Sequence, residues 1–118
     1  VHIWDGDLKN WFRDFKTTRI VFIFDSCAAG GMTDLSDTGR IVNMATEENG
    51  LDTAVELDSL GYGEFTYYFV VEGMGEMLAD TMEDDDLVTV EEAFDYAKAN
   101  VDYDHPTISD EFENDLLL

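Results

Sequence analysis

The sequence predicts an α/β domain, and three observations support this fold class. Residues 19–24 (RIVFIF) form a continuous run of β-branched and aromatic side chains, which is typical of a strand buried on both faces. A second predicted strand with fewer apolar residues follows at residues 40–46 (RIVNMAT), after small residues at 28–31 where the chain leaves the first strand. Segments with helical spacing of apolar residues lie before the first strand and after the second. Two buried strands joined by a crossover, with flanking helices, indicate an α/β fold, and a chain of 118 residues is one domain or a piece of one.

The first predicted element is a helix near residues 7–16. Its apolar side chains recur at helical spacing at Leu8, Trp11, Phe12 and Phe15. Asp5 or Asp7 can cap the first turn, where a carboxylate also favours the positive end of the helix. Because the apolar face of this helix needs a partner, we expect it to pack on a sheet.

A loop and a second helix follow the two predicted strands. Acidic residues and glycines alternate through residues 47–63 with few apolar positions, which indicates a solvated loop. The second helix begins at Phe65 and continues through Leu78. We expect Phe65, Phe69 and Val70 on its buried side.

The third predicted helix has the clearest start signal. Thr89 and Glu92 form a capping box, in which each side chain bonds the backbone N–H of the other. The buried stripe of this helix is Val90, Ala93, Phe94, Ala97 and Val101. Beyond Pro106, an extended tail can dock as an edge strand.

The charge of the chain excludes one class of partner. Twenty-eight Asp and Glu against six Lys and Arg give a formal net charge of -22. Such a chain repels a nucleic-acid backbone, so we expect no nucleic-acid partner. Salt or bound divalent cations would relieve its strong self-repulsion.

The sequence contains no membrane or targeting segment. The uncharged run at residues 20–24 is far shorter than the roughly 20 apolar residues of a membrane span, and no basic region precedes an apolar one at the N-terminus. We therefore expect a soluble chain without a membrane partner. Its compartment is left open, because the single cysteine, Cys27, cannot form an internal disulfide.

Cys27 is the candidate nucleophile. It follows a predicted buried strand and precedes a glycine-containing turn, the place where open α/β sheets present reactive groups. The alternative is that Cys27 is a small buried hydrophobic residue, as lone cysteines often are. A phosphatase loop would need an arginine where Thr33 stands, and Ser26 lacks the G-x-S-x-G context of a serine nucleophile.

Residues 19–32 (RIVFIFDSCAAGGM) resemble the nucleophile strand of caspase-like cysteine peptidases, and most closely that of the metacaspases and their prokaryotic relatives. In this family a hydrophobic strand ends in D-x-C-x-x-G. Segments similar to later family elements follow in the family's order, at residues 40–48, 61–74, 88–97 and 105–110. The resemblance covers nearly the whole chain and implies a caspase-like three-layer sandwich with a mostly parallel sheet.

The resemblance implies a cysteine endopeptidase. Cys27 would attack the peptide carbonyl as a thiolate within a Cys-His dyad, and its backbone N–H would help stabilise the oxyanion. Asp25 would line the S1 pocket and pair with a P1 Arg or Lys, so the implied partner is a polypeptide substrate with a basic P1 residue. The resemblance implies no required cofactor. Asp5, Asp7 and Asp34 are candidate ligands of a calcium ion.

The histidine of the family motif is missing from its expected place. In caspase-like enzymes it lies about 50 residues upstream of the cysteine, whereas only 26 residues precede Cys27. His2 lacks the Gly-His-Gly setting of the family, and His105, which follows both later helices, fits a surface or packing role. We therefore expect residues 1–118 to be the C-terminal part of the catalytic domain, from the nucleophile strand onward. The N-terminal remainder of the same domain would supply the histidine, and the isolated fragment would be inactive.

Two other hypotheses remain open. The chain could be a non-catalytic caspase-like module that serves acidic interactions or calcium binding, with Cys27 merely buried. It could also be an unrelated halophile α/β domain, whose stability would rise with salt. If the strand at residues 20–24 lacks partners on one side, its apolar surface would be exposed and the chain would tend to self-associate.

Overall fold

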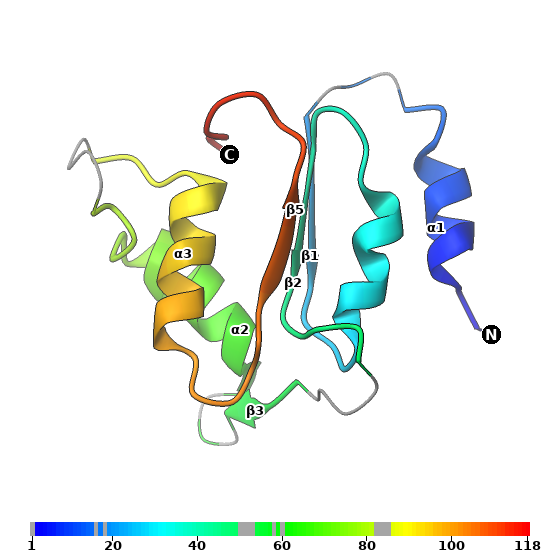
Figure 1. Ribbon diagram of the computed structural model, residues 1–118. Coiled ribbons are helices and arrows are strands. Elements are labelled where there is room, and N and C mark those ends of the chain that lie inside the picture. Colours follow the sequence, from blue (N-terminus) through cyan, green and yellow to red (C-terminus); the bar gives the residue numbers. More distant parts are fainter. Residues whose placement is uncertain are drawn as a thin grey trace.

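The computed structural model describes residues 2–15, 17, 19–49, 54–57, 59, 61–81 and 86–118. It has three layers, with a three-stranded sheet between two groups of helices (Figure 1). On one side lie the helix α1 (Asp5–Phe12) and the 3₁₀-helix η1 (Ala29–Leu35). On the other side lie α2 (Glu64–Thr66), its continuation η2 (Tyr67–Gly75), and α3 (Val90–Asn100). The α/β class is confirmed.

The central strand of the sheet is β2 (Arg40–Met44), which is buried along its whole length. It pairs in parallel with β1 (Ile20–Phe24) and in antiparallel fashion with β5 (Thr107–Asp110). The sheet is therefore mixed rather than mostly parallel. The C-terminal tail does dock as an edge strand, since β5 lies at one edge of the order β1-β2-β5.

The expectation that β1 is buried on both faces is wrong. Its residues are half-buried, and Ile23 is 39% exposed. The reason is that β1 lies at an edge of the sheet. Among the described strands only β2 lies next to it, so its side chains have fewer neighbours than those of a central strand. The burial expected for β1 belongs instead to β2, although β2 contains the polar residues Arg40 and Asn43.

Two hydrophobic clusters fill the spaces on the two sides of the sheet. The cluster against α3 consists of Ile41, Ala45, Phe65, Phe69, Ala79, Val90, Ala93, Phe94, Ala97 and Leu116. The cluster against η1 consists of Ala29, Leu35, Val42 and Met44, with Leu8 of α1 packed against it. Successive residues of β2 thus serve opposite clusters, as the alternation of a strand requires.

The helix α1 is shorter than predicted and begins earlier. The Asp7 carboxylate accepts the Trp4 N–H at 3.1 Å, which fixes the start of the helix, and the last helical residue is Phe12. Residue 16 of the predicted helix lies outside the described residues. No residue of α1 is buried; instead Arg40, itself buried, donates from Nη2 to the Phe12 carbonyl at 2.7 Å.

The helices on the other face follow the predictions in part. The capping box of α3 is confirmed, because Thr89 Oγ1 accepts the Glu92 N–H at 3.2 Å and the Glu92 carboxylate accepts the Thr89 N–H at 2.9 Å. Phe65 and Phe69 are buried as expected, but Val70 is 40% exposed. The next buried residue after Phe69 is Gly73, four positions on, so Val70 lies next to the buried side of the helix rather than on it. The helix ends at Gly75 rather than Leu78.

The predicted loop at residues 47–63 contains a short hairpin. Strands β3 (Glu56–Leu57) and β4 (Tyr62–Gly63) pair in antiparallel fashion, with Glu56 opposite Gly63. Residues 50–53, 58 and 60 of this stretch lie outside the described residues. Within the part of the chain that is described, no helix is long and apolar enough to cross a membrane.

Candidate functional site

Cys27 is exposed at the carboxyl end of β1. Its turn is tied to the neighbouring strand by Thr46, which lies just beyond β2 and is fully buried. The Thr46 hydroxyl accepts the Ala29 N–H at 2.9 Å and donates to the Ser26 carbonyl at 2.9 Å. One side chain therefore fixes the backbone on both sides of the thiol.

The turn itself has an unusual backbone. Ala28, immediately after Cys27, has φ of 53° and lies in the left-handed region, which costs a residue with a Cβ about 1 kcal/mol. At Gly30 a Cβ would overlap the backbone of residues 47 and 48, so only glycine fits. Strain of this kind persists where the surrounding structure enforces it, and it is enriched at functional sites.

A hollow of about 430 Å³ opens beside the thiol. The described residues that line it are Asp25, Ser26, Cys27, Ala54, Val55, Glu56, Gly63 and Thr66. The Asp25 carboxylate is half-buried here, and its Oδ2 accepts from the N–H of Thr66 at 2.9 Å and from its hydroxyl at 2.5 Å. A Cβ at Gly63 would overlap this carboxylate. The sequence-predicted residues Cys27 and Asp25 thus share one hollow, and Asp25 is held in a fixed position.

Two buried carboxylates, which the sequence analysis did not single out, support the walls of this hollow. Glu64 accepts three successive backbone N–H groups, from residues 102, 103 and 104, each at 3.0 Å. Asp104 in turn accepts the Val55 N–H at 3.0 Å and the Phe65 N–H at 3.2 Å. Asp104 therefore joins the segment leading into β3 to the start of α2. No local pattern marks this pair, because its partners lie about 40 positions away in the sequence.

The carboxylates around the hollow influence one another. The pKa of Asp104 is raised from 3.8 to about 6, mainly by burial and also by the nearby charges of Glu64 and Asp25. The bonds from Val55 and Phe65 act in the opposite direction, because they stabilise the ionised form. The concentration of negative charge favours a cationic ligand or side chain at this end of the sheet.

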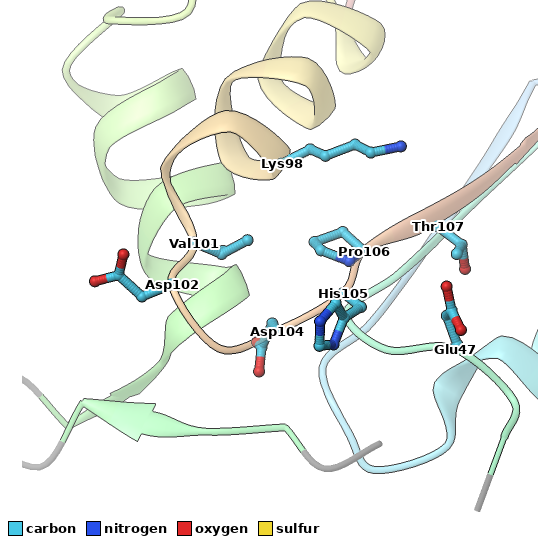
Figure 2. A pocket seen from close by; sticks show the side chains of 8 residues that line it. All are labelled: Glu47, Lys98, Val101, Asp102, Asp104, His105, Pro106 and Thr107. Atoms are coloured by element: carbon cyan, nitrogen blue, oxygen red, sulfur yellow. The ribbon is translucent and has the colours of Figure 1, made fainter. Parts of the chain in front are cut away.

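Neither histidine among the residues that are described lines the hollow beside Cys27. His2 is exposed near the N-terminus, with its ring centroid 6.4 Å from that of Trp4. His105 lines a second hollow of about 410 Å³, together with Lys98, Asp104 and Glu47 (Figure 2). Figure 2 shows that His105 and Glu47 approach this hollow from different segments, before β5 and after β2.

The three aspartates predicted to bind calcium lie on two elements. Asp5 and Asp7 belong to the first turn of α1, where Asp5 Oδ1 accepts the Gly6 N–H at 2.7 Å and Asp7 accepts from the backbone of residue 4. Asp34 is exposed on η1. Across the described ranges, no three His, Cys, Asp or Glu side chains converge to hold a metal ion. The calcium site stays a prediction.

Comparisons with known proteins add no relative. No family model, curated protein or solved structure matches the chain. A functional assignment therefore depends on the residues and geometry of the site.

Proposed function

We propose that the chain carries the nucleophile and the S1 carboxylate of a cysteine endopeptidase of caspase or metacaspase type, which cleaves after Arg or Lys. The observation that supports this proposal is the shared hollow, where an exposed Cys27 lies beside an Asp25 carboxylate held by Thr66. A thiol that substrate can reach and a carboxylate two residues away would provide the nucleophile and the specificity group of such a reaction, and its histidine would come from the N-terminal remainder.

In the proposed reaction, Cys27 is the nucleophile of the first step and the leaving group of the second. The thiolate attacks the peptide carbonyl, so that an S–C bond forms and the C–N bond breaks, while a histidine of the N-terminal remainder gives its proton to the leaving amine. Water then adds to the thioester and gives a proton to the histidine, and the S–C bond breaks, which releases the new carboxyl end of the substrate and restores the thiolate. The fixed turn would hold the sulfur and the Cys27 N–H in one place relative to the carbonyl.

Asp25 would select the substrate. A P1 guanidinium or ammonium entering the hollow would meet a carboxylate that is already oriented by two hydrogen bonds, so little ordering is needed on binding. Loss of one partner of such a charge pair commonly costs 2 kcal/mol or more, which corresponds to roughly 30-fold in kcat/KM. The Asp25→Asn variant should therefore lose at least that factor on Arg and Lys substrates.

The second candidate function is a non-catalytic caspase-like module for acidic interactions or calcium binding. The concentration of negative charge around the hollow, which favours a cationic ligand, supports it. In that case the fixed turn and the carboxylates would serve stability and charge, and the parent protein would not turn over any peptide.

A peptidase assay on the parent protein, extended upstream by about 100 residues to ordinary domain size, separates the two functions. Fluorogenic peptides ending in Arg, Lys or Asp are tested with and without calcium. We expect turnover of the Arg and Lys peptides that Cys27→Ala abolishes and Ser26→Ala, a neighbouring exposed position, retains. Asp25→Asn should lose selectivity, whereas Asp95→Asn, which removes an exposed carboxylate on α3 outside the hollow, should keep it. A folded parent that cleaves none of these peptides would support the non-catalytic module.

A further inference from the structure

The second hollow, of about 410 Å³, lies between the end of α3 and the start of β5 (Figure 2). The described residues that line it are Glu47, Lys98, Val101, Asp102, Asp104, His105, Pro106 and Thr107. All of these follow β2 in the chain and none belongs to α1 or β1, so these walls do not depend on what adjoins β1. A volume of this size falls within the range of small-molecule sites, about 300–1,000 Å³.

The backbone around this hollow is fixed by a buried acid. Glu64 is 2% exposed, and its carboxylate accepts the N–H groups of residues 102, 103 and 104, each at 3.0 Å. Burying a carboxylate is costly unless hydrogen bonds of this kind compensate for the lost water. Pro106 has a restricted φ, and Thr107 belongs to the ladder of β5 with β2. The loop from α3 to β5 is thus held in its middle and at its end, so a ligand that binds there orders little backbone.

Lys98 is the exceptional charge of the hollow. It is the only Lys or Arg after residue 40, in a stretch that contains 22 Asp and Glu. Among the described residues, however, no carboxylate lies within ion-pair distance of its ammonium group, and Nζ lies 5.8 Å from the centroid of the Phe94 ring. Figure 2 shows Lys98 extending from α3 on one side of Pro106, with Glu47 on the other side. The hollow therefore presents an ammonium group and a carboxylate at separate places.

Asp104 adds a second feature that is typical of ligand sites. It lines the hollow at 4% exposure, and its pKa is raised to about 6, mainly by burial. An approaching cation offsets that effect, because it stabilises the ionised form of the carboxylate. Carboxylates that are perturbed in this way within a concave site are candidates for binding. Together with Glu47, Asp104 favours a positive group on the side of the hollow away from Lys98.

The charges of the hollow restrict the kind of ligand that fits. A purely anionic ligand is repelled by a chain of net charge -22, and a purely cationic one meets the Lys98 ammonium group. A molecule that carries both charges can satisfy both sides of the hollow. Val101 and Pro106 supply apolar surface between the two charged groups. The complementary ligand is therefore a zwitterion with an apolar body.

We propose that the second hollow binds a zwitterion of about dipeptide size with apolar side chains. Its carboxylate contacts Lys98, its ammonium group contacts Glu47, and its side chains pack on Val101 and Pro106. For a ligand of this size we expect a dissociation constant of about 1 mM or below. The proposal does not rest on the peptidase function, because Cys27 is not among the residues that line this hollow.

An NMR titration of the 118-residue chain with the dipeptide leucyl-leucine tests the proposal, at about 0.5 M salt so that long-range attraction and repulsion are screened. We expect saturable shifts of the amide signals of residues 98–105 and residue 47. Leucyl-leucine amide lacks the carboxylate and N-acetyl-leucyl-leucine lacks the ammonium group. Each should bind about fivefold or more weakly, because one ion pair is lost. The proposal is overturned if leucyl-leucine shifts none of these signals, or if the three compounds bind equally.

A lysine variant tests the contact with the carboxylate. Lys98→Met should weaken the binding of leucyl-leucine by about fivefold or more and leave that of leucyl-leucine amide unchanged, because the amide has no carboxylate to lose its partner. Lys9→Met, at an exposed lysine of α1, is the matched control and should change neither. Glu47→Gln should also weaken leucyl-leucine, whereas Asp102→Asn, whose side chain points away from the others in Figure 2, should not. Equal weakening of both compounds by Lys98→Met, or an equal effect of Lys9→Met, would refute the assigned contact.

Discussion

Replacing Asp104 by Asn should change how the stability of the protein depends on pH. Asp104 is 4% exposed, and its pKa rises from 3.8 to about 6 on folding. An acid whose pKa is raised by folding favours the folded state when it is protonated. Its contribution is therefore fully present below about pH 4 and is lost as the pH rises through 6. The difference of about two pKa units corresponds to roughly 3 kcal/mol.

The Asn variant lacks this titration but has a separate cost. Its amide offers one accepting oxygen where Asp104 serves the N–H groups of both Val55 and Phe65, so one of these donors loses its partner. That loss costs about 1–3 kcal/mol. We therefore expect the variant to be less stable than the wild type at pH 4. Relative to the wild type, it should gain about 3 kcal/mol by pH 7.

Urea unfolding followed by circular dichroism at pH 4, 5, 6 and 7, at one ionic strength, measures this difference. The two proteins share all other charges, so their overall repulsion nearly cancels in the comparison. Asp95→Asn, at an exposed position on α3, controls for the loss of one negative charge. A difference between wild type and Asp104→Asn that stays constant from pH 4 to pH 7 would falsify the reasoning.

Three further substitutions test the turn and the hollow. Ala28→Gly should raise the free energy of unfolding by up to about 1 kcal/mol by relieving the positive φ, and a lower melting temperature would contradict this. Gly63→Ala should cost about 1–3 kcal/mol in urea unfolding because its methyl group overlaps the Asp25 carboxylate, whereas Gly6→Ala, with open space around it, should not destabilise. Thr46→Val keeps the shape of the side chain but leaves both bridged backbone groups without the hydroxyl. It should cost about 1–3 kcal/mol and change the rate at which iodoacetamide modifies the thiol, and an unchanged rate would argue against a positioning role.

Local signals in the sequence predicted the elements well where one segment determines its own structure. The β-branched run of β1 and the capping box of Thr89 and Glu92 are such cases, because a few neighbouring residues determine the conformation. The burial of β1 could not be predicted, since it depends on which strands flank it. The short hairpin at Glu56 was missed because only two residue pairs form it, in a stretch with few apolar positions.

The candidate site shows the same difference between residues that a local motif reveals and residues whose partners are distant in the sequence. Cys27 and Asp25 were found from one short motif, and the structure places both in one hollow. Thr46, Glu64 and Asp104 were missed because each acts on backbone groups about 20 to 40 residues away, and such partners become visible only when the chain is folded. The tertiary structure determines which backbone groups these side chains hydrogen-bond.

The loose attachment of α1 has a consequence for spectroscopy. No residue of α1 is fully buried; Leu8 packs against the cluster on η1, the Phe12 ring lies 4.9 Å from that of Phe22, and Arg40 donates a hydrogen bond to the Phe12 carbonyl. A segment with so few buried contacts should open at a lower free energy than the sheet and α3. Of the two tryptophans of the chain, Trp11 lies in α1 and Trp4 lies immediately before its first residue. Intrinsic tryptophan emission therefore reports the detachment of one peripheral helix, and its transition in urea should precede the loss of the far-ultraviolet dichroism that marks global unfolding.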